Sequence, residues 1–121
     1  MKHNRCVQLL YHKQLNKQEG NMTKTPEGEI KDQVRKVLDE VGAYYFFPAA
    51  NGYGRSGVPD IVACIGGHFI GIECKAGSKQ PTALQQRELE NISKAGGTGI
   101  LINADNIGKL KDILIIGESN D

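Results

Sequence analysis

The sequence predicts an α/β protein whose mixed sheet has helices on both faces. Amphipathic stripes with helical spacing alternate with short apolar runs in the order α-β-β-β-α-β-α, and a Gly-Gly pair joins two of those runs as a tight hairpin. A chain of 121 residues suits one domain, and a hydrophobic fraction of 39% suits one core.

The first helix has clear start and stop signals. Thr25 is an N-cap residue, Pro26 suits the first helical position, and Gly42 ends an apolar stripe formed by Ile30, Val34, Val37, Leu38 and Val41. Glu29 lies about 100° around the helix from Ile30, on the flank of the buried face. Its carboxylate either reaches into a cleft beside the core or is an ordinary acid at the positive end of the helix dipole.

The other elements are bounded by glycine or proline. In order, they are a strand over 43–48, a glycine-rich loop over 51–57, strands over 60–65 and 68–75, a helix over 82–95, a strand over 99–103, and a helix that Asp105 caps and that ends near Ile115.

The chain divides by charge into two parts. Residues 1–21 form a basic N-terminal extension of net charge +3, either a short amphipathic helix or a frayed arm, and residues 22–121 form a domain of net charge −2. No run approaches the roughly 20 apolar residues of a membrane span, and no secretory signal is evident. Three cysteines without metal-type spacing fit a reducing compartment. We therefore expect a cytoplasmic protein, in a host cell if it is encoded by a phage, with no membrane partner.

The hairpin predicts where two carboxylates meet. If the glycines at 66–67 are the two loop residues, Ile65 pairs with His68 and Asp60 lies opposite Glu73. Opposed like charges destabilise a sheet unless a positive charge lies between them. Magnesium, which needs only one or two carboxylates plus water and phosphate, would supply it. A β-bulge that shifted the register by one residue would instead turn the carboxylates to different faces.

Lys75 adds an ammonium to the same spot, because it is two residues beyond Glu73 and so lies on the same face of the strand. Two carboxylates, a cation and a lysine are the groups that metal-assisted phosphodiester hydrolysis requires. The alternative is an exposed strand end with a Glu/Lys ladder.

These residues resemble a known family. Val58-Pro59-Asp60 followed by Ile72-Glu73-Cys74-Lys75 resembles the PD-(D/E)XK nuclease motif, and the run GRSGVPDIVACIGGHFIGIECKAGSKQPTALQ resembles the stand-alone, phage-type form of the VRR-NUC domain. The resemblance covers about residues 23–115. It implies a restriction-endonuclease-like core in which Asp60, Glu73 and the main-chain carbonyl of Cys74 bind the metal. It further implies that Lys75 is the catalytic lysine and that Glu29 is the acidic residue of the first helix.

The family also places a glutamine on the helix after the lysine. Helical geometry favours Gln85, because it shares a face with the apolar residues Leu89 and Ile92, whereas Gln86 points about 100° away. Gln85 either contacts the active site or is an amphipathic side chain of the helix's first turn.

Four further residues are candidates for DNA binding. Arg55 and Ser56 precede the proposed metal site and suit a phosphate, Tyr53 could stack on an unpaired base, and Lys79 could extend a track along the backbone. All four could equally be solvated loop residues.

We therefore expect an Mg²⁺- or Mn²⁺-dependent endonuclease that hydrolyses DNA phosphodiester bonds. The resemblance implies selectivity for branched DNA, such as Holliday junctions or flaps, and a stand-alone domain of this size is expected to act as a homodimer. The alternative is a nucleic-acid binding or assembly module with a vestigial metal site. The net charge of +1 excludes only a bulk electrostatic binder.

Overall fold

The computed structural model describes residues 24–49 and 54–119, so the basic extension at 1–21 lies outside the described residues. Helix α2 (Pro26–Val41) begins where predicted, since the Thr25 hydroxyl accepts a hydrogen bond from the Gly28 amide at 3.0 Å. It ends at Gly42, whose φ of 73° is left-handed and favours glycine. The buried residues of α2 belong to the predicted stripe: Ile30, Val34, Leu38 and Val41.

The sheet has four strands in spatial order β1-β2-β3-β4, namely β1 (Tyr44–Phe46), β2 (Ile61–Ile65), β3 (His68–Cys74) and β4 (Thr98–Ile102). The first three strands are antiparallel neighbours, and β4 runs parallel to β3. The parallel pair is connected through helix α3 (Ala83–Lys94), as a crossover of this kind requires. The predicted mixed α/β class is therefore confirmed.

The hairpin between β2 and β3 has the predicted register. Pairing runs without a bulge from the turn to the Ile61–Ile72 pair, and Gly66 and Gly67 have positive φ values of 57° and 80°, which suit a tight two-residue turn. The ladder ends at Ile61, so Asp60 lies just beyond it rather than within the strand. This position leaves the Asp60 side chain free to make its own contact with β3.

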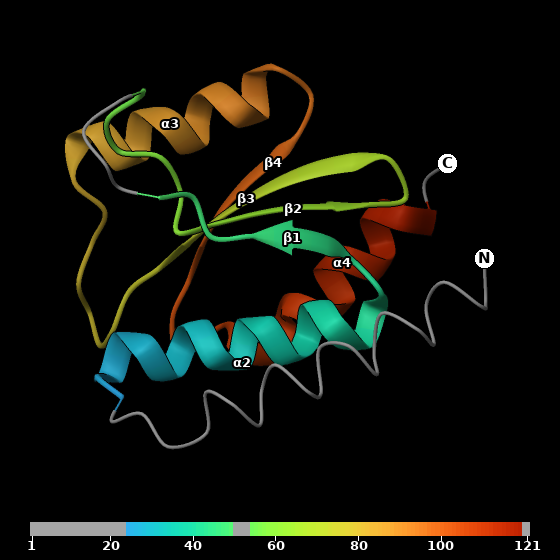
Figure 1. Cartoon of the computed structure of the whole chain (residues 1–121), viewed down its shortest axis with the longest axis horizontal. Coiled ribbons are helices and arrows are strands. Elements are labelled where there is room, and N and C mark those ends of the chain that lie inside the picture. The colour runs from blue at the N-terminus through green and yellow to red at the C-terminus, as the bar shows by residue number, and fades with distance from the viewer. Residues whose placement is uncertain (1–23, 50–53, 120–121) are drawn as a thin grey trace.

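Helices cover both faces of the sheet (Figure 1). Helix α3 lies on one face, whereas α2 and α4 (Leu110–Ser119) lie on the other, over the main core. Two glycines let α3 approach closely, since a Cβ at Gly71 would lie 2.4 Å from Ile92 Cδ1 and one at Gly99 would lie 2.2 Å from the Leu89 carbonyl oxygen. Within the described ranges, no helix has the length and apolar character that a membrane span requires.

The segment after β4 differs from the expected helix capped by Asp105. A short 3-10 helix, η1 (Ile107–Lys109), comes before α4. Asn103 closes the turn, because its Oδ1 accepts hydrogen bonds from the amides of Asp105 at 2.9 Å and Asn106 at 3.2 Å. The expected cap was therefore wrong, because the 3-10 helix starts after Asn106 without a side-chain cap, and the Ile107 amide donates to the Asn103 carbonyl instead.

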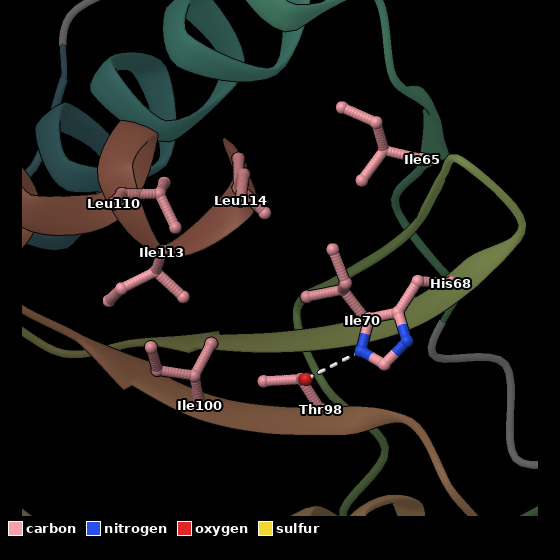
Figure 2. Close-up of a pocket in the computed structure, with 8 residues that line it drawn as sticks. All are labelled: Ile65, His68, Ile70, Thr98, Ile100, Leu110, Ile113 and Leu114. Carbon is pink, nitrogen blue, oxygen red and sulfur yellow. Dashed lines mark hydrogen bonds between the residues drawn. The ribbon is translucent and has the colours of Figure 1, made fainter. Parts of the chain in front are cut away.

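The end of the sheet nearest the hairpin turn is closed mainly by apolar side chains (Figure 2). There His68 Nε2 lies 2.7 Å from the Thr98 hydroxyl, and a cavity of about 20 Å³ remains between the sheet and α4. A space of this size holds about one water molecule. This end of the molecule therefore contributes to the packing of the core. The candidate catalytic residues Glu73 and Lys75 lie at the other end of β3.

Candidate active site

Asp60 is anchored where β2 begins and β3 ends. Its Oδ2 accepts a hydrogen bond from the Cys74 amide at 2.9 Å, and its Oδ1 lies 3.7 Å from Lys31 Nζ on α2. The Cys74 amide lies beyond the β2–β3 ladder, and the carboxylate acts as its acceptor in place of a strand carbonyl. The register therefore brings Asp60 to the backbone of the residue that directly follows Glu73.

Glu73 is a buried carboxylate that lacks part of its hydrogen bonding. The residue is 1% exposed, and its Oε1 has no hydrogen-bond partner among the described residues. Burial, the negative charge of Asp60 and hydrogen bonding with Asp60 raise the pKa of Glu73 from 4.5 to about 7, while the charge of Lys75 opposes this rise. A buried acceptor without a partner is costly, so this oxygen is one that a cation or a donor would stabilise.

Lys75 lies beside Glu73 as the alternation of the strand predicts. Its Nζ lies 3.7 Å from Glu73 Oε2, and its side chain is 14% exposed. The Lys75 amide donates to the Ile102 carbonyl at 3.0 Å, which continues the pairing with β4 for one residue past β3. The three residues at the centre of the sequence prediction, Asp60, Glu73 and Lys75, are thus brought together.

The acid of α2 nearest to this cluster is Glu27 rather than Glu29. Glu29 is exposed, whereas Glu27 is half-buried, lies 3.7 Å from Lys31 and contributes to the raised pKa of Glu73. Helical spacing indicates the same difference, because Glu27 lies only about 60° around the helix from the buried Ile30 whereas Glu29 lies about 100° away. A role for Glu29 stays a prediction, and its exposed position does not favour it.

Lys31 is a second basic residue that the sequence reasoning missed. It follows Glu27 by one helical turn and lies between that carboxylate and Asp60, at 3.7 Å from each. The i, i+4 spacing of Glu27 and Lys31 was a visible signal. The long-range partner Asp60 was not.

Gln85 caps its own helix. Its Oε1 accepts a hydrogen bond from the Thr82 amide at 2.9 Å, and the Thr82 hydroxyl accepts one from the Gln85 amide at 3.2 Å, which together form a capping box. This geometry agrees with the alternative interpretation of a first-turn side chain. A contact between Gln85 and the cluster stays a prediction.

The structure describes three of the four candidate DNA-binding residues, and they differ in their contacts. Arg55 binds Glu88 on α3 through two hydrogen bonds, from Nε to Oε1 and from Nη2 to Oε2, both 2.8 Å long. Ser56 and Lys79 are exposed, and Tyr53 lies outside the described residues. Arg55 therefore has a structural partner that the sequence did not indicate.

The cluster fits a cation that binds oxygen and keeps open coordination positions. Among residues 24–49 and 54–119, no three His, Cys, Asp or Glu side chains group closely enough to hold a metal by themselves. Burial and then the charge of Asp60 raise the pKa of the Cys74 thiol to about 12, so the sulfur is protonated at neutral pH in the metal-free protein. The remaining oxygen ligands are two carboxylates beside a main-chain segment. A typical Mg²⁺ site takes only one or two carboxylates from the protein and completes its coordination with water and phosphate.

Comparison with known proteins gives two matches. Residues 26–102, more than half of the chain, match the family described as archaeal Holliday junction resolvase (Hjc). A protein named as a candidate nuclease, p44, of Acyrthosiphon pisum secondary endosymbiont phage 1 is 33% identical over 85 residues, which cover 69% of this chain and 85% of that protein. No solved structure matches.

Proposed function

The chain belongs to the archaeal Holliday junction resolvase (Hjc) family, and we propose that it is an Mg²⁺- or Mn²⁺-dependent endonuclease that hydrolyses phosphodiester bonds in branched DNA. Membership in this family implies a hydrolase that cleaves DNA. Metal dependence is supported mainly by Glu73, a buried carboxylate beside Asp60 and Lys75 with one oxygen that has no partner among the described residues.

Asp60, Glu73 and the main-chain carbonyl of Cys74 would hold the metal. The Cys74 amide is directed at Asp60, and the N–H and C=O of one strand residue point to the same side, which supports a role for that carbonyl. A bound divalent cation supplies positive charge for the phosphoryl oxygen and lowers the pKa of bound water.

Lys75 is placed to steady the attacking oxygen and to offset the charge that develops on the phosphate. Its ammonium is held by Glu73 in a largely water-excluded site, where electrostatic stabilisation is stronger than in bulk water. Lys31 offsets the charge of Asp60 from the α2 side. The ammonium groups of both lysines would attract the negative charge of an incoming phosphate.

The proposal extends to the DNA structure that is cut and to the oligomeric state of the protein. The name of the matched family supports a four-way junction as the first substrate to test. A homodimer would present two cutting sites to a branched substrate. The likeness of GRSGVPD and IECK to VRR-NUC domains supports a placement of the chain near that phage-type group within the restriction-endonuclease-like superfamily.

Contacts with the DNA backbone are proposed for Arg55, Ser56 and Lys79, and stacking on an unpaired base is proposed for Tyr53. The Arg55 side chain is 66% exposed, and Glu88 uses two of the five N–H donors of a guanidinium, so the others can face a phosphate. Ser56 and Lys79 are exposed. These contacts would fix the position of the substrate rather than read its sequence.

The test is cleavage of end-labelled four-way junctions, flaps and linear duplexes in Mg²⁺, Mn²⁺ or EDTA. Asp60→Asn and Lys75→Met should each lower the rate by at least about a hundredfold, the usual scale for one catalytic group. Glu40→Gln is the matched control, because Glu40 is an exposed carboxylate paired with Lys111. Cleavage that persists in EDTA, or in both variants, would overturn the mechanism. Tight junction binding without cleavage would favour the binding or assembly module.

A further inference from the structure

The loop over 54–59, directly before Asp60, is pressed against helix α3. Gly57 has a φ of +78°, and a Cβ there would lie 2.7 Å from the Leu84 carbonyl carbon and 2.9 Å from the Gln85 nitrogen. Such a short approach between two main chains requires glycine. The loop backbone therefore rests directly on the first turn of α3.

A second contact lies about one helical turn farther along α3. The guanidinium of Arg55 grips Glu88 with two hydrogen bonds of 2.8 Å, across 33 residues of sequence. Glu88 is only 5% exposed, and its hydrogen bond with Arg55 lowers its pKa. Because the Glu88 carboxylate is buried while the Arg55 side chain is 66% exposed, we expect the loss of Arg55 to cost more than the loss of one partner of an ordinary surface ion pair.

The loop borders an open groove, so neighbouring side chains cover only part of it. A groove of about 710 Å³ lies along the same face, and its lining includes Arg55, Glu88, Pro59 and the exposed aromatic residues Phe46 and Phe69. A segment beside open space is held mainly by its specific contacts. Here they are the close approach at Gly57, the packing of Pro59 beside Gly71 and the Arg55–Glu88 pair.

The segment that connects Arg55 to Asp60 of the proposed metal site is short and constrained. Only four residues lie between Arg55 and Asp60, and Pro59 has a restricted φ and is buried beside Gly71 of β3. Asp60 then makes its hydrogen bond with the Cys74 amide. A shift of the loop on α3 would be passed on to the Asp60 carboxylate.

We propose that Arg55 and Glu88 are positioning residues for the metal site, because their ion pair fixes the loop on α3 and so sets Asp60 against the end of β3. This inference rests on the proposed function for the metal. It gives Arg55 a role through Asp60, separate from any contact with a phosphate.

The experiment compares Arg55→Gln, Glu88→Gln, the double variant and the charge swap Arg55→Glu/Glu88→Arg with the full chain. The first readout, which needs neither metal nor DNA, is exchange of the Cys74 amide hydrogen relative to that of Ile72, followed by NMR. The second is Mn²⁺ affinity without DNA, followed by electron paramagnetic resonance. The third is the split between kcat and KM on a four-way junction. The control pair is Glu40→Gln and Lys111→Gln, since these side chains form an exposed ion pair at 3.2 Å.

We expect each single variant to speed Cys74 exchange and to weaken Mn²⁺ binding, each by about tenfold, which corresponds to 1.4 kcal/mol. The double variant should be no worse than either single one, because the two residues act as a unit. The charge swap should recover at least part of the loss. For Glu88→Gln, kcat at low metal should fall and return at saturating metal, while KM for DNA stays within about twofold.

Three outcomes would overturn the proposal. The first is Cys74 exchange and Mn²⁺ affinity that both match those of the control variants. The second is faster amide exchange in residues 54–59, followed in the same NMR experiment, with no change in Cys74 exchange or Mn²⁺ affinity. The third is a KM for DNA that rises in Arg55→Gln but not in Glu88→Gln, in which case Arg55 is a phosphate ligand only. Wild-type protein that shows neither Mn²⁺ binding nor cleavage would instead count against the proposed function, and Cys74 exchange would still decide the positioning role.

Discussion

Glu73 is the residue at which fold stability and the proposed chemistry conflict most directly. Its carboxylate is buried, lies beside Asp60 and has one oxygen without a partner. Ionised Glu73 therefore destabilises the metal-free fold, whereas the same ionised group is what a cation would bind. Stored strain of this kind is common where a site is built for a ligand.

The pH dependence of stability should reveal this conflict. The folded-state pKa of Glu73, about 7, lies above its ordinary value of 4.5, so the folded state binds the proton more tightly and stability is lost as pH rises between these values. In EDTA, Glu73→Gln should raise the free energy of unfolding by about 2–3 kcal/mol more at pH 8 than at pH 4.5. Urea denaturation measures this, with Glu40→Gln as the exposed control. Parallel pH profiles of wild type and Glu73→Gln would contradict the assignment.

Lys31 should compete with a metal for the charge of Asp60. Its ammonium lies 3.7 Å from Asp60 Oδ1 and remains about one-third exposed, so solvent screens part of the interaction. Lys31→Met should therefore tighten Mn²⁺ binding by about threefold to tenfold while lowering the melting temperature in EDTA. Titration calorimetry of Lys31→Met and of the exposed Lys36→Met compares the two. Weaker Mn²⁺ binding in Lys31→Met would mean that Lys31 helps to assemble the site instead.

At the scale of elements, the sequence predicted what local patterns determine. The Gly-Gly turn at 66–67 determined the hairpin register, and the capped stripe determined α2. The Arg55–Glu88 pair was not predictable, because it joins a loop to a helix 33 residues away and neither residue has a local pattern that indicates the other. The position of Glu27 could have been predicted, because helical spacing alone places it on the same side of the helix as Ile30.

The contact between the loop and α3 predicts different effects for two glycines. Gly54 and Gly57 both have positive φ values, +94° and +78°, but only Gly57 has atoms of another segment within reach of a Cβ. Gly54→Ala should cost about 1 kcal/mol from backbone strain alone, whereas Gly57→Ala should cost about 2–4 kcal/mol because it also displaces the loop from Leu84. Urea denaturation in EDTA measures both. Equal losses would mean that the close approach contributes nothing to stability.

At the scale of the whole molecule, the proposed dimer should be visible by mass. One chain is 13.2 kDa, so sedimentation equilibrium should give about twice that mass if the chain dimerises. Nicks on a symmetric junction should then appear in pairs on opposite strands. A monomer that cuts one strand only would contradict the dimer and leave the chemistry of Asp60 and Lys75 intact.

The charge balance of the chain predicts how DNA affinity is controlled. The net charge is only +1, and at the candidate site the carboxylates of Asp60, Glu73 and Glu27 offset the ammonium groups of Lys31 and Lys75, so a metal-free chain should attract phosphate only weakly there. A divalent cation adds two positive charges at that point. Junction affinity should therefore rise at least about tenfold when Ca²⁺ replaces EDTA, and Asp60→Asn should lose most of this gain. Fluorescence anisotropy with a labelled junction measures both effects, with Glu40→Gln expected to behave as wild type. Affinity that is equally high in EDTA would mean that basic side chains, such as those at 1–21, bind DNA without help from the metal site.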